Sequence, residues 1–312
     1  MLFVCGVGWS GTSLLQSMLA AHPEIDFLPE TSFIRRYVFP RTLEKQMKAG
    51  GVESVASTLD DDLRIQHLGM DSSGLTSGLA NDSPLDIAIY RQIVARLSRE
   101  SAKLVGDKDP RMVELLPLVH SHFPNSYLVH LVRDPRDVLV SKQKASWSRS
   151  RAWWQHAFAN RVQFELGQSN GRRYFADRYC VMLYEELLAE PEKILRKLCE
   201  TIGIEYADEM LTEFGEAAKR LVRADEMQWK SETTGPLLKK NVGKWQESLS
   251  PFQVATTERV CRPNMRFGEY SHSNTRGMAA NLGRCFGGLL SVMAPVYQFV
   301  RNRQATAAIK LS

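Results

Sequence analysis

The stretch LFVCGVGWSGTSLL, residues 2–15, decides the fold class of this 312-residue chain. Residues 2–5 are apolar and predict a short strand, residues 6–10 form a glycine-rich loop, and residues 11–21 place leucine and methionine on one helical face. The His-Pro pair at 22–23 ends this helix because the residue before a proline is pushed out of the helical region. The chain therefore opens as strand, loop and helix, which is the first unit of an α/β fold.

The loop of this unit is suited to a phosphate group. Gly6 and Gly11 have the spacing of the phosphate-binding motif GxxxxGK[ST], with Thr12 where the motif has lysine. Backbone N–H groups and the helix dipole favour an anion there, and the hydroxyls of Ser10, Thr12 and Ser13 add donors. A tight turn without a ligand would use the same glycines but would not need three hydroxyls. The missing lysine and the lack of a clear carboxylate for Mg²⁺ argue against cleavage of ATP or GTP.

Strands and helices continue to alternate along the chain. Strands are predicted at 103–105, 126–132 and 179–183, and helices at 84–99, 111–122, 135–144, 151–168 and 191–202. Strands separated by helices of this length predict a mostly parallel sheet flanked by helices. Ligands of such sheets bind at the carboxyl ends of the strands, and each polar cluster considered below follows a predicted strand.

A second anion site is predicted after the strand at 126–132. Arg133 directly follows the carboxyl end of this strand, and Ser141 lies about two turns into the next helix. Both side chains can therefore reach one anion. The planar guanidinium of arginine forms two charge-assisted hydrogen bonds with a phosphate. Pairing of Arg133 with Asp134 or Asp137 is the structural alternative.

The two clusters together resemble a known family. GVGWSGTSLL at 6–15 and LVRDPRDVLVSK at 131–142 look like the two signatures of the sulfotransferases. The resemblance implies a P-loop nucleoside triphosphate hydrolase-like sulfotransferase fold and 3′-phosphoadenosine 5′-phosphosulfate as the sulfuryl donor, with no metal. It implies that Arg133 and Ser141 bind the 3′-phosphate of this donor. The loop residues that it implies for the 5′-phosphosulfate are Gly8, Trp9, Ser10, Gly11, Thr12 and Ser13.

Two longer segments are similar to the protein-tyrosine branch of this family. SGTSLLQSMLAAHPEIDFLPET at 10–31 resembles the loop, helix and Glu-Thr ending of that branch, which implies that Glu30 is the catalytic base. GDKDPRMVELLPLVHSHFPNSYLVHLVRDPR at 106–136 resembles its Lys-Asp-Pro segment, which implies that Lys108 is the catalytic lysine. A surface cap or salt bridge is the alternative for Glu30, and a pair with a neighbouring aspartate is the alternative for Lys108.

Two later segments extend the resemblance, which is discontinuous and ends near residue 252. LYEELL at 183–188 implies that Tyr184 lies against the adenine, and a core aromatic is the alternative. KKNVGKWQESLSP at 239–251 resembles the late basic segment, which implies that Lys244 contacts the donor, and a solvated lysine is the alternative.

One position departs from the family. The residue before Ser-Gly-Thr in the loop is usually arginine or lysine, but Trp9 occupies it here. The cation expected near the transferred group must then come from Lys108 or Arg136, or activity is lower.

The resemblance divides the chain into two parts. Residues 1–270 form the expected sulfotransferase domain, in which residues 41–103 are a helical and irregular insertion that shapes the acceptor site. Residues 271–312 form a C-terminal helical extension. Its apolar run at 285–300 is shorter than the roughly 20 residues of a membrane-spanning helix. A docked helix is the first interpretation, and a membrane-surface contact through 285–303 is the alternative.

Composition restricts the partners. A hydrophobic content of 44% and a net charge of +5 are ordinary for a soluble enzyme, and the basic residues lack the clustering of a nucleic-acid binder. Five scattered cysteines without a CxxC pair predict neither a disulfide framework nor a zinc site. The start of the chain leaves no room for a signal peptide, so a cytoplasmic location is expected.

The sequence thus predicts in-line transfer of a sulfuryl group to a hydroxyl acceptor. The acceptor stays open between tyrosyl, carbohydrate, lipid and small-molecule hydroxyls. A P-loop nucleotide kinase or phosphotransferase, and a non-catalytic relative that binds the donor nucleotide, are the alternatives.

Overall fold

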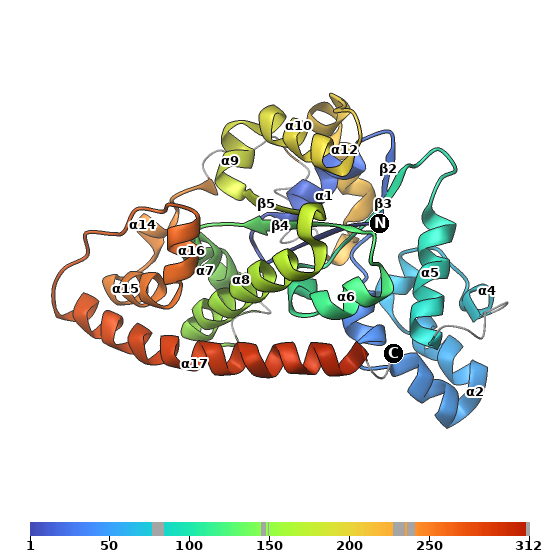
Figure 1. The fold of residues 1–312 in the computed structure, drawn as a ribbon, viewed down its shortest axis with the longest axis horizontal. Coiled ribbons are helices and arrows are strands. Elements are labelled where there is room, and N and C mark those ends of the chain that lie inside the picture. Colours follow the sequence, from blue (N-terminus) through green and yellow to red (C-terminus); the bar gives the residue numbers. More distant parts are fainter. Residues whose placement is uncertain (77–83, 145–147, 149, 227–234, 236–240, 310–312) are drawn as a thin grey trace.

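A computed structural model describes residues 1–76, 84–144, 148, 150–226, 235 and 241–309 (Figure 1). Within these residues five strands form one sheet in the order β2-β3-β1-β4-β5, and every neighbouring pair is parallel. The strands are β1 (Leu2–Gly6), β2 (Ile25–Phe27), β3 (Leu104–Lys108), β4 (Tyr127–Val132) and β5 (Tyr179–Leu183). The predicted α/β fold with a mostly parallel sheet is confirmed.

Helices cover both faces of this sheet, above and below it in Figure 1. The helices on one face are α1 (Thr12–Ala20), α9 (Tyr184–Ala189), α10 (Pro191–Ile202), α11 (Glu209–Thr212) and α12 (Phe214–Leu221). Those on the other face are η2 (Pro110–Glu114), α6 (Leu116–His122) and α8 (Trp153–Phe175). Because side chains alternate along a strand, Leu2 and Val4 of β1 pack in the first core while Phe3 and Cys5 pack in the second.

The insertion between β2 and β3 is mostly helical. Its helices are α2 (Thr42–Asp60), α3 (Leu63–Gln66), α4 (Ser72–Thr76) and α5 (Leu85–Leu97). The sequence pattern missed α2 because Gly50 and Gly51 interrupt it, with Gly51 at a φ of 66°. These helices pack with η1 (Ile34–Val38) in the same core as Phe3. The insertion therefore adjoins the segment that follows Glu30.

The remaining helices lie between β4 and β5 and after α12. They are α7 (Pro135–Lys144), η4 (Ala176–Arg178), η5 (Ala224–Glu226), α14 (Trp245–Ser248), α15 (Pro251–Val260), α16 (Arg262–Phe267) and α17 (Met278–Ile309). The last helix is longer than the apolar run suggested, because it continues through Pro295. None of the helices described by the structure is long and apolar enough to cross a membrane.

Candidate active site

The carboxyl ends of the strands bring the predicted site residues to one edge of the sheet. β1 runs into the loop at Gly6, β2 leads to Glu30, β3 ends at Lys108, β4 leads to Arg133 and β5 leads to Tyr184. The strand order therefore places Glu30 and Lys108 on one side of the loop and Arg133 and Tyr184 on the other. This is the edge at which α/β sheets bind ligands.

The loop between β1 and α1 has the backbone geometry of an anion cradle. Trp9 and Gly11 have positive φ values of 76° and 93°. The backbone N–H and the hydroxyl of Ser10 both donate to the Val7 carbonyl, at 3.0 and 2.5 Å. α1 begins at Thr12, so the N–H groups of its first turn have no partner within the helix. These N–H groups and the dipole of α1 favour a negatively charged ligand.

Lys108 and Glu30 form an ion pair beside this loop. The Lys108 side chain is fully buried, and its Nζ contacts the Glu30 carboxylate. The same Nζ donates to the Ser13 hydroxyl at 3.2 Å. Glu30 keeps 20% of its side chain exposed, so the pair has one buried cation and one carboxylate open to solvent. This arrangement joins the ends of β2, β3 and the loop in one polar cluster.

The neighbouring aspartates each have another side-chain partner, whereas the side chain of Lys108 pairs with Glu30. Asp107 accepts a hydrogen bond from the Tyr90 hydroxyl at 2.7 Å. Asp109 accepts from Arg35 Nε at 2.9 Å. The sequence ended this strand at Val105, whereas β3 runs on through Lys108, so residues 107 and 108 point to opposite faces.

Arg133 lies on the other side of the loop and is 7% exposed. Its guanidinium donates to the Trp9 carbonyl at 3.0 Å and to the Asn241 carbonyl at 2.6 Å. It also stacks over the Tyr184 ring, with 4.5 Å from Cζ to the ring centroid. A Cβ on Gly11 would lie 2.3 Å from that ring, so Tyr184 fits against the loop only because residue 11 is glycine. Arg133 therefore links the loop, Tyr184 and a segment far along the chain.

Asp137 and Asn241 belong to this cluster and were missed as site residues. The Asp137 carboxylate accepts hydrogen bonds from the backbone N–H of Gly243 at 2.7 Å and of Trp245 at 3.0 Å. These bonds hold the chain segment whose Asn241 carbonyl accepts from Arg133. A carboxylate four residues after Arg133 was the available signal, but its partners lie more than 100 residues away in sequence.

The two other predicted donor-binding residues lie near this cluster. Ser141 is half-buried on α7, one turn after Asp137, so the two side chains share a face of the helix. Lys244 is half-buried between Gly243 and Trp245, the two residues that Asp137 holds. Lys244 therefore lies within the segment that Arg133 contacts, and Ser141 lies on the helix face that carries Asp137.

Arg136 is not at the loop, which removes it as a substitute for the missing loop cation. Its guanidinium is buried, pairs with Asp134 and Glu258 at 2.7 Å each, and lies 3.8 Å from the Trp245 ring centroid. Lys108 is thus the one of the two candidate cations that contacts a loop residue.

Two further features bear on the chemistry. The described residues include no group of three or more His, Cys, Asp and Glu side chains that could hold a metal ion.

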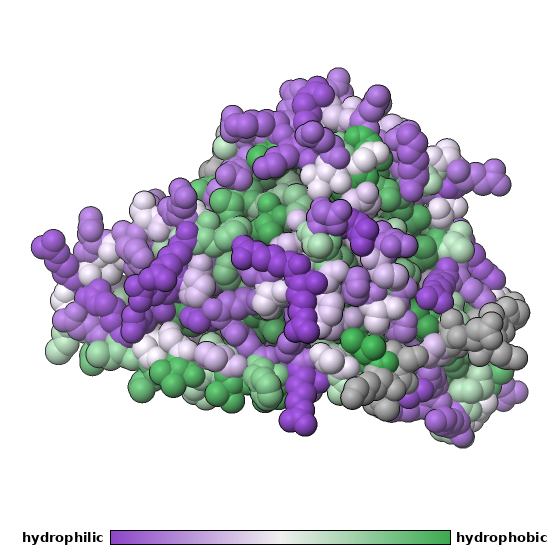
Figure 2. Space-filling model, in the orientation of Figure 1, coloured by the Kyte–Doolittle hydropathy of each residue, from purple (hydrophilic) through white to green (hydrophobic). Residues whose placement is uncertain are grey.

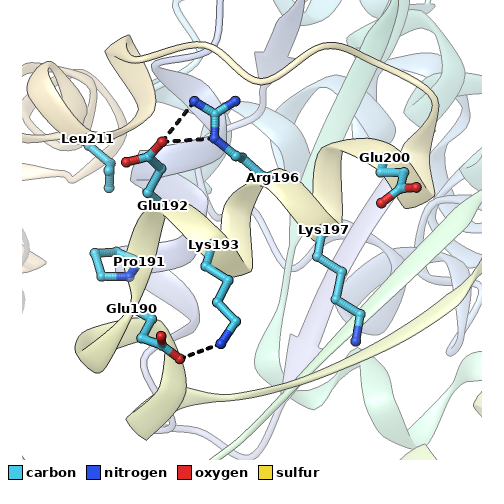
Figure 3. A pocket seen from close by; sticks show the side chains of 8 residues that line it. All are labelled: Glu190, Pro191, Glu192, Lys193, Arg196, Lys197, Glu200 and Leu211. Atoms are coloured by element: carbon cyan, nitrogen blue, oxygen red, sulfur yellow. Dashed lines mark hydrogen bonds and ion pairs between the residues drawn. The ribbon is translucent and has the colours of Figure 1, made fainter.

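A shallow groove along α10 is lined by charges that pair with one another, Glu190 with Lys193 and Glu192 with Arg196, each at 2.8 Å (Figure 3). Because these charges are already paired on a helix surface, this groove is not the candidate site.

Comparison with known proteins decides the family. A sequence model described as "Sulfotransferase family" matches residues 2–208. The chain belongs to the sulfotransferase family. The match contains the loop, Glu30, Lys108, Arg133 and Tyr184, whereas Asn241 lies beyond it.

This sulfotransferase-family chain is similar to curated relatives of two kinds. It is 27% identical over 221 residues to "Protein-tyrosine sulfotransferase" of Drosophila melanogaster, over 68% of this chain and 39% of that protein. It is 27% identical over 196 residues to "Carbohydrate sulfotransferase 3" of Tetronarce californica, over 55% of this chain and 42% of that protein. The matched region is less than half the length of either relative.

A solved structure shares the fold. The sulfotransferase domain from the Synechococcus PCC 7002 olefin synthase has a TM-score of 0.61 and 20% identity, over 87% of this chain and 94% of that domain. This likeness confirms the predicted sulfotransferase fold.

Proposed function

We propose that the chain transfers a sulfuryl group from 3′-phosphoadenosine 5′-phosphosulfate to a hydroxyl acceptor. The observation that carries this proposal is the pair of polar clusters on either side of one anion-binding loop. Lys108 and Glu30 lie on one side, and Arg133, with Tyr184, lies on the other. A donor with a sulfated 5′-phosphate and a separate 3′-phosphate would use both clusters. A nucleotide triphosphate would use only the loop side.

The donor would be fixed at two points. The loop N–H groups and the Thr12 and Ser13 hydroxyls would bind the 5′-phosphosulfate, and Arg133 with Ser141 would bind the 3′-phosphate. Tyr184 would lie beside the adenosine, with Lys244 on the neighbouring segment. Fixing the donor and the acceptor in line contributes on the order of 7–11 kcal/mol to lowering such barriers in favourable cases.

The chemical step is an in-line displacement at sulfur. The acceptor oxygen forms a bond to sulfur while the bond from sulfur to the bridging 5′-phosphate oxygen breaks. Glu30 accepts the acceptor's hydroxyl proton, and the electron pair of the broken bond stays on the phosphate oxygen. Lys108 and the loop N–H groups stabilise the charge on that oxygen, which makes adenosine 3′,5′-bisphosphate the second product. In this scheme Lys108 replaces the cation that Trp9 does not supply.

The acceptor is proposed by class alone. The relatives are named for tyrosine and carbohydrate acceptors, and the insertion at 41–103 adjoins Glu30 through η1. We assign acceptor binding to this insertion within a domain of residues 1–270, with 271–312 as a helical extension. A cytoplasmic location stays a prediction from the sequence.

Turnover of Glu30→Gln tests the proposal. The assay measures release of adenosine 3′,5′-bisphosphate from the donor, in EDTA, with tyrosyl peptides, sugars, hydroxylated lipids and phenols as acceptors. Glu30→Gln keeps a hydrogen-bonding partner for Lys108 but removes the base, so we expect turnover to fall about 10²–10⁴-fold with donor binding retained. Glu24→Gln, which removes the surface pair with Lys103, is the matched control and keeps full turnover. Wild-type binding of the bisphosphate without turnover on any acceptor would identify a non-catalytic relative instead.

A further inference from the structure

One face of α17 exposes an apolar stripe that the core does not use. Figure 2 shows it as the green lower edge of the molecule, where Figure 1 places α17. The large apolar side chains on this face are 44–79% exposed and recur at steps of three and four residues. They are Met278, Leu282, Leu289, Val292, Val296, Phe299 and Val300, with Met293 beside them. We call these residues the outer face of α17.

The opposite face holds α17 to the body of the protein. Its buried residues are Ala280, Gly283, Gly287, Leu290, Ala294 and Ala305. Gly283 and Gly287 allow close approach to α15, since a Cβ on either would lie 2.5–2.8 Å from α15 backbone oxygens. Near its end, Arg301 contacts the buried carboxylate of Glu114. The helix is therefore fixed in one orientation, and its outer face stays available.

The sequence of this helix and its flanks carries charge of one sign. The segment from Arg276 to the end of the sequence has five basic residues and no Asp or Glu. The rest of the chain has 35 basic and 35 acidic residues, so this segment accounts for the whole net charge of +5. Positive charge of this kind is attracted to anionic surfaces.

A basic hollow borders the stripe. A hollow of about 500 Å³ lies between α8, α15, α16 and α17, and its lining includes Arg161, Arg259, Arg262, Arg266 and Ser291. Arg259, Arg262 and Arg266 are exposed, and no carboxylate is among the lining residues. A Cβ on Gly288 would lie 3.9 Å from Arg259 Nε, and Gly288 lies one turn before Val292, so Arg259 of the hollow lies on the flank of α17 beside the outer face. The hollow thus presents several guanidinium groups next to exposed apolar side chains.

We propose that the outer face of α17 and this arginine hollow together bind the surface of an anionic phospholipid membrane. The apolar side chains would enter the boundary between headgroups and acyl chains, and the arginines would contact lipid phosphates. A helix about 48 Å long lies along the membrane surface in this arrangement. Pairing of two copies through the same face fits less well, because each copy would bring only positive charge to the contact.

Sedimentation with vesicles tests the proposal independently of catalysis. The full chain is mixed with vesicles of phosphatidylcholine alone or with added phosphatidylserine. We expect binding only to the second kind, and weaker binding at high salt. Val296→Glu should lower the partition coefficient by about tenfold or more, because it puts a carboxylate in the apolar stripe. Arg262→Ala with Arg266→Ala should lower it by about 25-fold, or about fivefold for each arginine.

Leu63→Glu is the matched control, because Leu63 is 63% exposed on α3 and belongs neither to the outer face of α17 nor to the arginine hollow. It should bind vesicles like the wild type, and all variants should keep the wild-type melting temperature. The proposal is overturned if the wild type does not bind the anionic vesicles, or if Leu63→Glu weakens binding as much as Val296→Glu. A dimer in solution that Val296→Glu separates, without vesicle binding, would assign the face to a second copy instead.

Discussion

At the scale of single residues, the proposed mechanism gives the central chemical role to the buried Nζ of Lys108. Its contacts with Glu30 and Ser13 tie it to both the proposed base and the loop. A fully buried ammonium is costly unless it is paired, so its presence at a strand end suits a functional role better than a structural one.

Lys108→Met is expected to lower kcat by about 10²–10³-fold, the usual cost of removing one group that stabilises transition-state charge. Methionine fills the buried volume but leaves the Glu30 carboxylate without its partner, so we expect the free energy of unfolding to fall by about 1–3 kcal/mol. Lys103→Met, at a side chain 62% exposed, is the control and leaves both quantities unchanged. Steady-state kinetics and urea unfolding measure the two effects. A kcat for Lys108→Met within tenfold of the wild type would remove Lys108 from the chemistry.

Asp107, next to Lys108, predicts a pH dependence of stability. Burial raises the pKa of Asp107 to about 7, with a further increase from Asp109 that the hydrogen bond from Tyr90 opposes. Between about pH 4 and pH 7 the folded chain holds a proton on Asp107 that the unfolded chain has lost. The stability contributed by this proton is complete below pH 4 and is lost as pH rises through 7.

Asp107→Asn removes this dependence, because the amide stays neutral at every pH and can still accept from Tyr90. Relative to the wild type, the variant should gain about 3 kcal/mol of stability as pH rises from 5 to 8. Urea unfolding at both pH values measures the difference, and Asp177→Asn, on the surface, is the control. Equal pH dependence in Asp107→Asn and the wild type would contradict the prediction.

At the scale of elements, α7 positions a distant segment for the proposed 3′-phosphate site. Asp137 in its first turn accepts two backbone N–H groups from residues 243 and 245. Burial raises the pKa of Asp137, and these two hydrogen bonds oppose the increase. Through these hydrogen bonds Asp137 holds the segment before α14 next to Arg133, which follows the end of β4.

Asp137→Ala should weaken binding of adenosine 3′,5′-bisphosphate by about tenfold, because the segment that contacts Arg133 loses two hydrogen bonds. Calorimetric titration gives the Kd. A positioning role predicts a higher KM for the donor with kcat changed much less. Asp208→Ala, at an exposed position before α11, is the control. An unchanged Kd would show that the segment keeps its place without Asp137.

The sequence predicted the elements whose evidence was local. The loop, Arg133 and Tyr184 each follow a strand directly, so a short motif gave both the element and the residue. Lys108 needed the strand to continue beyond Val105, since only then does alternation turn Asp107 away from it. Asp137 accepts from Gly243 and Trp245, and Asn241 accepts from Arg133. Each contact spans more than 100 residues, and no local pattern records such a contact.

At the scale of the whole molecule, Glu114 joins three helices below the sheet. It accepts hydrogen bonds from Arg111 at 3.2 Å and from Gln163 at 2.6 Å, and it pairs with Arg301 of α17. α17 is thereby attached to η2 and α8. The sequence suggested a docked C-terminal helix but gave no sign of this attachment, because each partner is an ordinary charged residue on a separate segment.

Glu114→Ala should lower the free energy of unfolding by on the order of 2 kcal/mol, because it leaves the buried Gln163 amide and the partly buried Arg301 guanidinium without their acceptor. Hydrogen exchange should also quicken in the second half of α17. Glu216→Ala breaks an exposed pair with Lys219 and should stay within about 0.5 kcal/mol of the wild type. Equal effects of the two substitutions would mean that Glu114 does not hold α17 in place.

Calorimetric titration with adenosine 3′,5′-bisphosphate in EDTA tests the central claim most directly. The account predicts micromolar binding to the wild type and a Kd at least about 10²-fold weaker for Arg133→Ala, because a charge-assisted bidentate contact is lost. Arg133→Lys, which keeps the charge without the planar fork, should lie between the two. No binding to folded wild-type protein, or equal binding by the wild type and Arg133→Ala, would contradict the sulfotransferase assignment of this site.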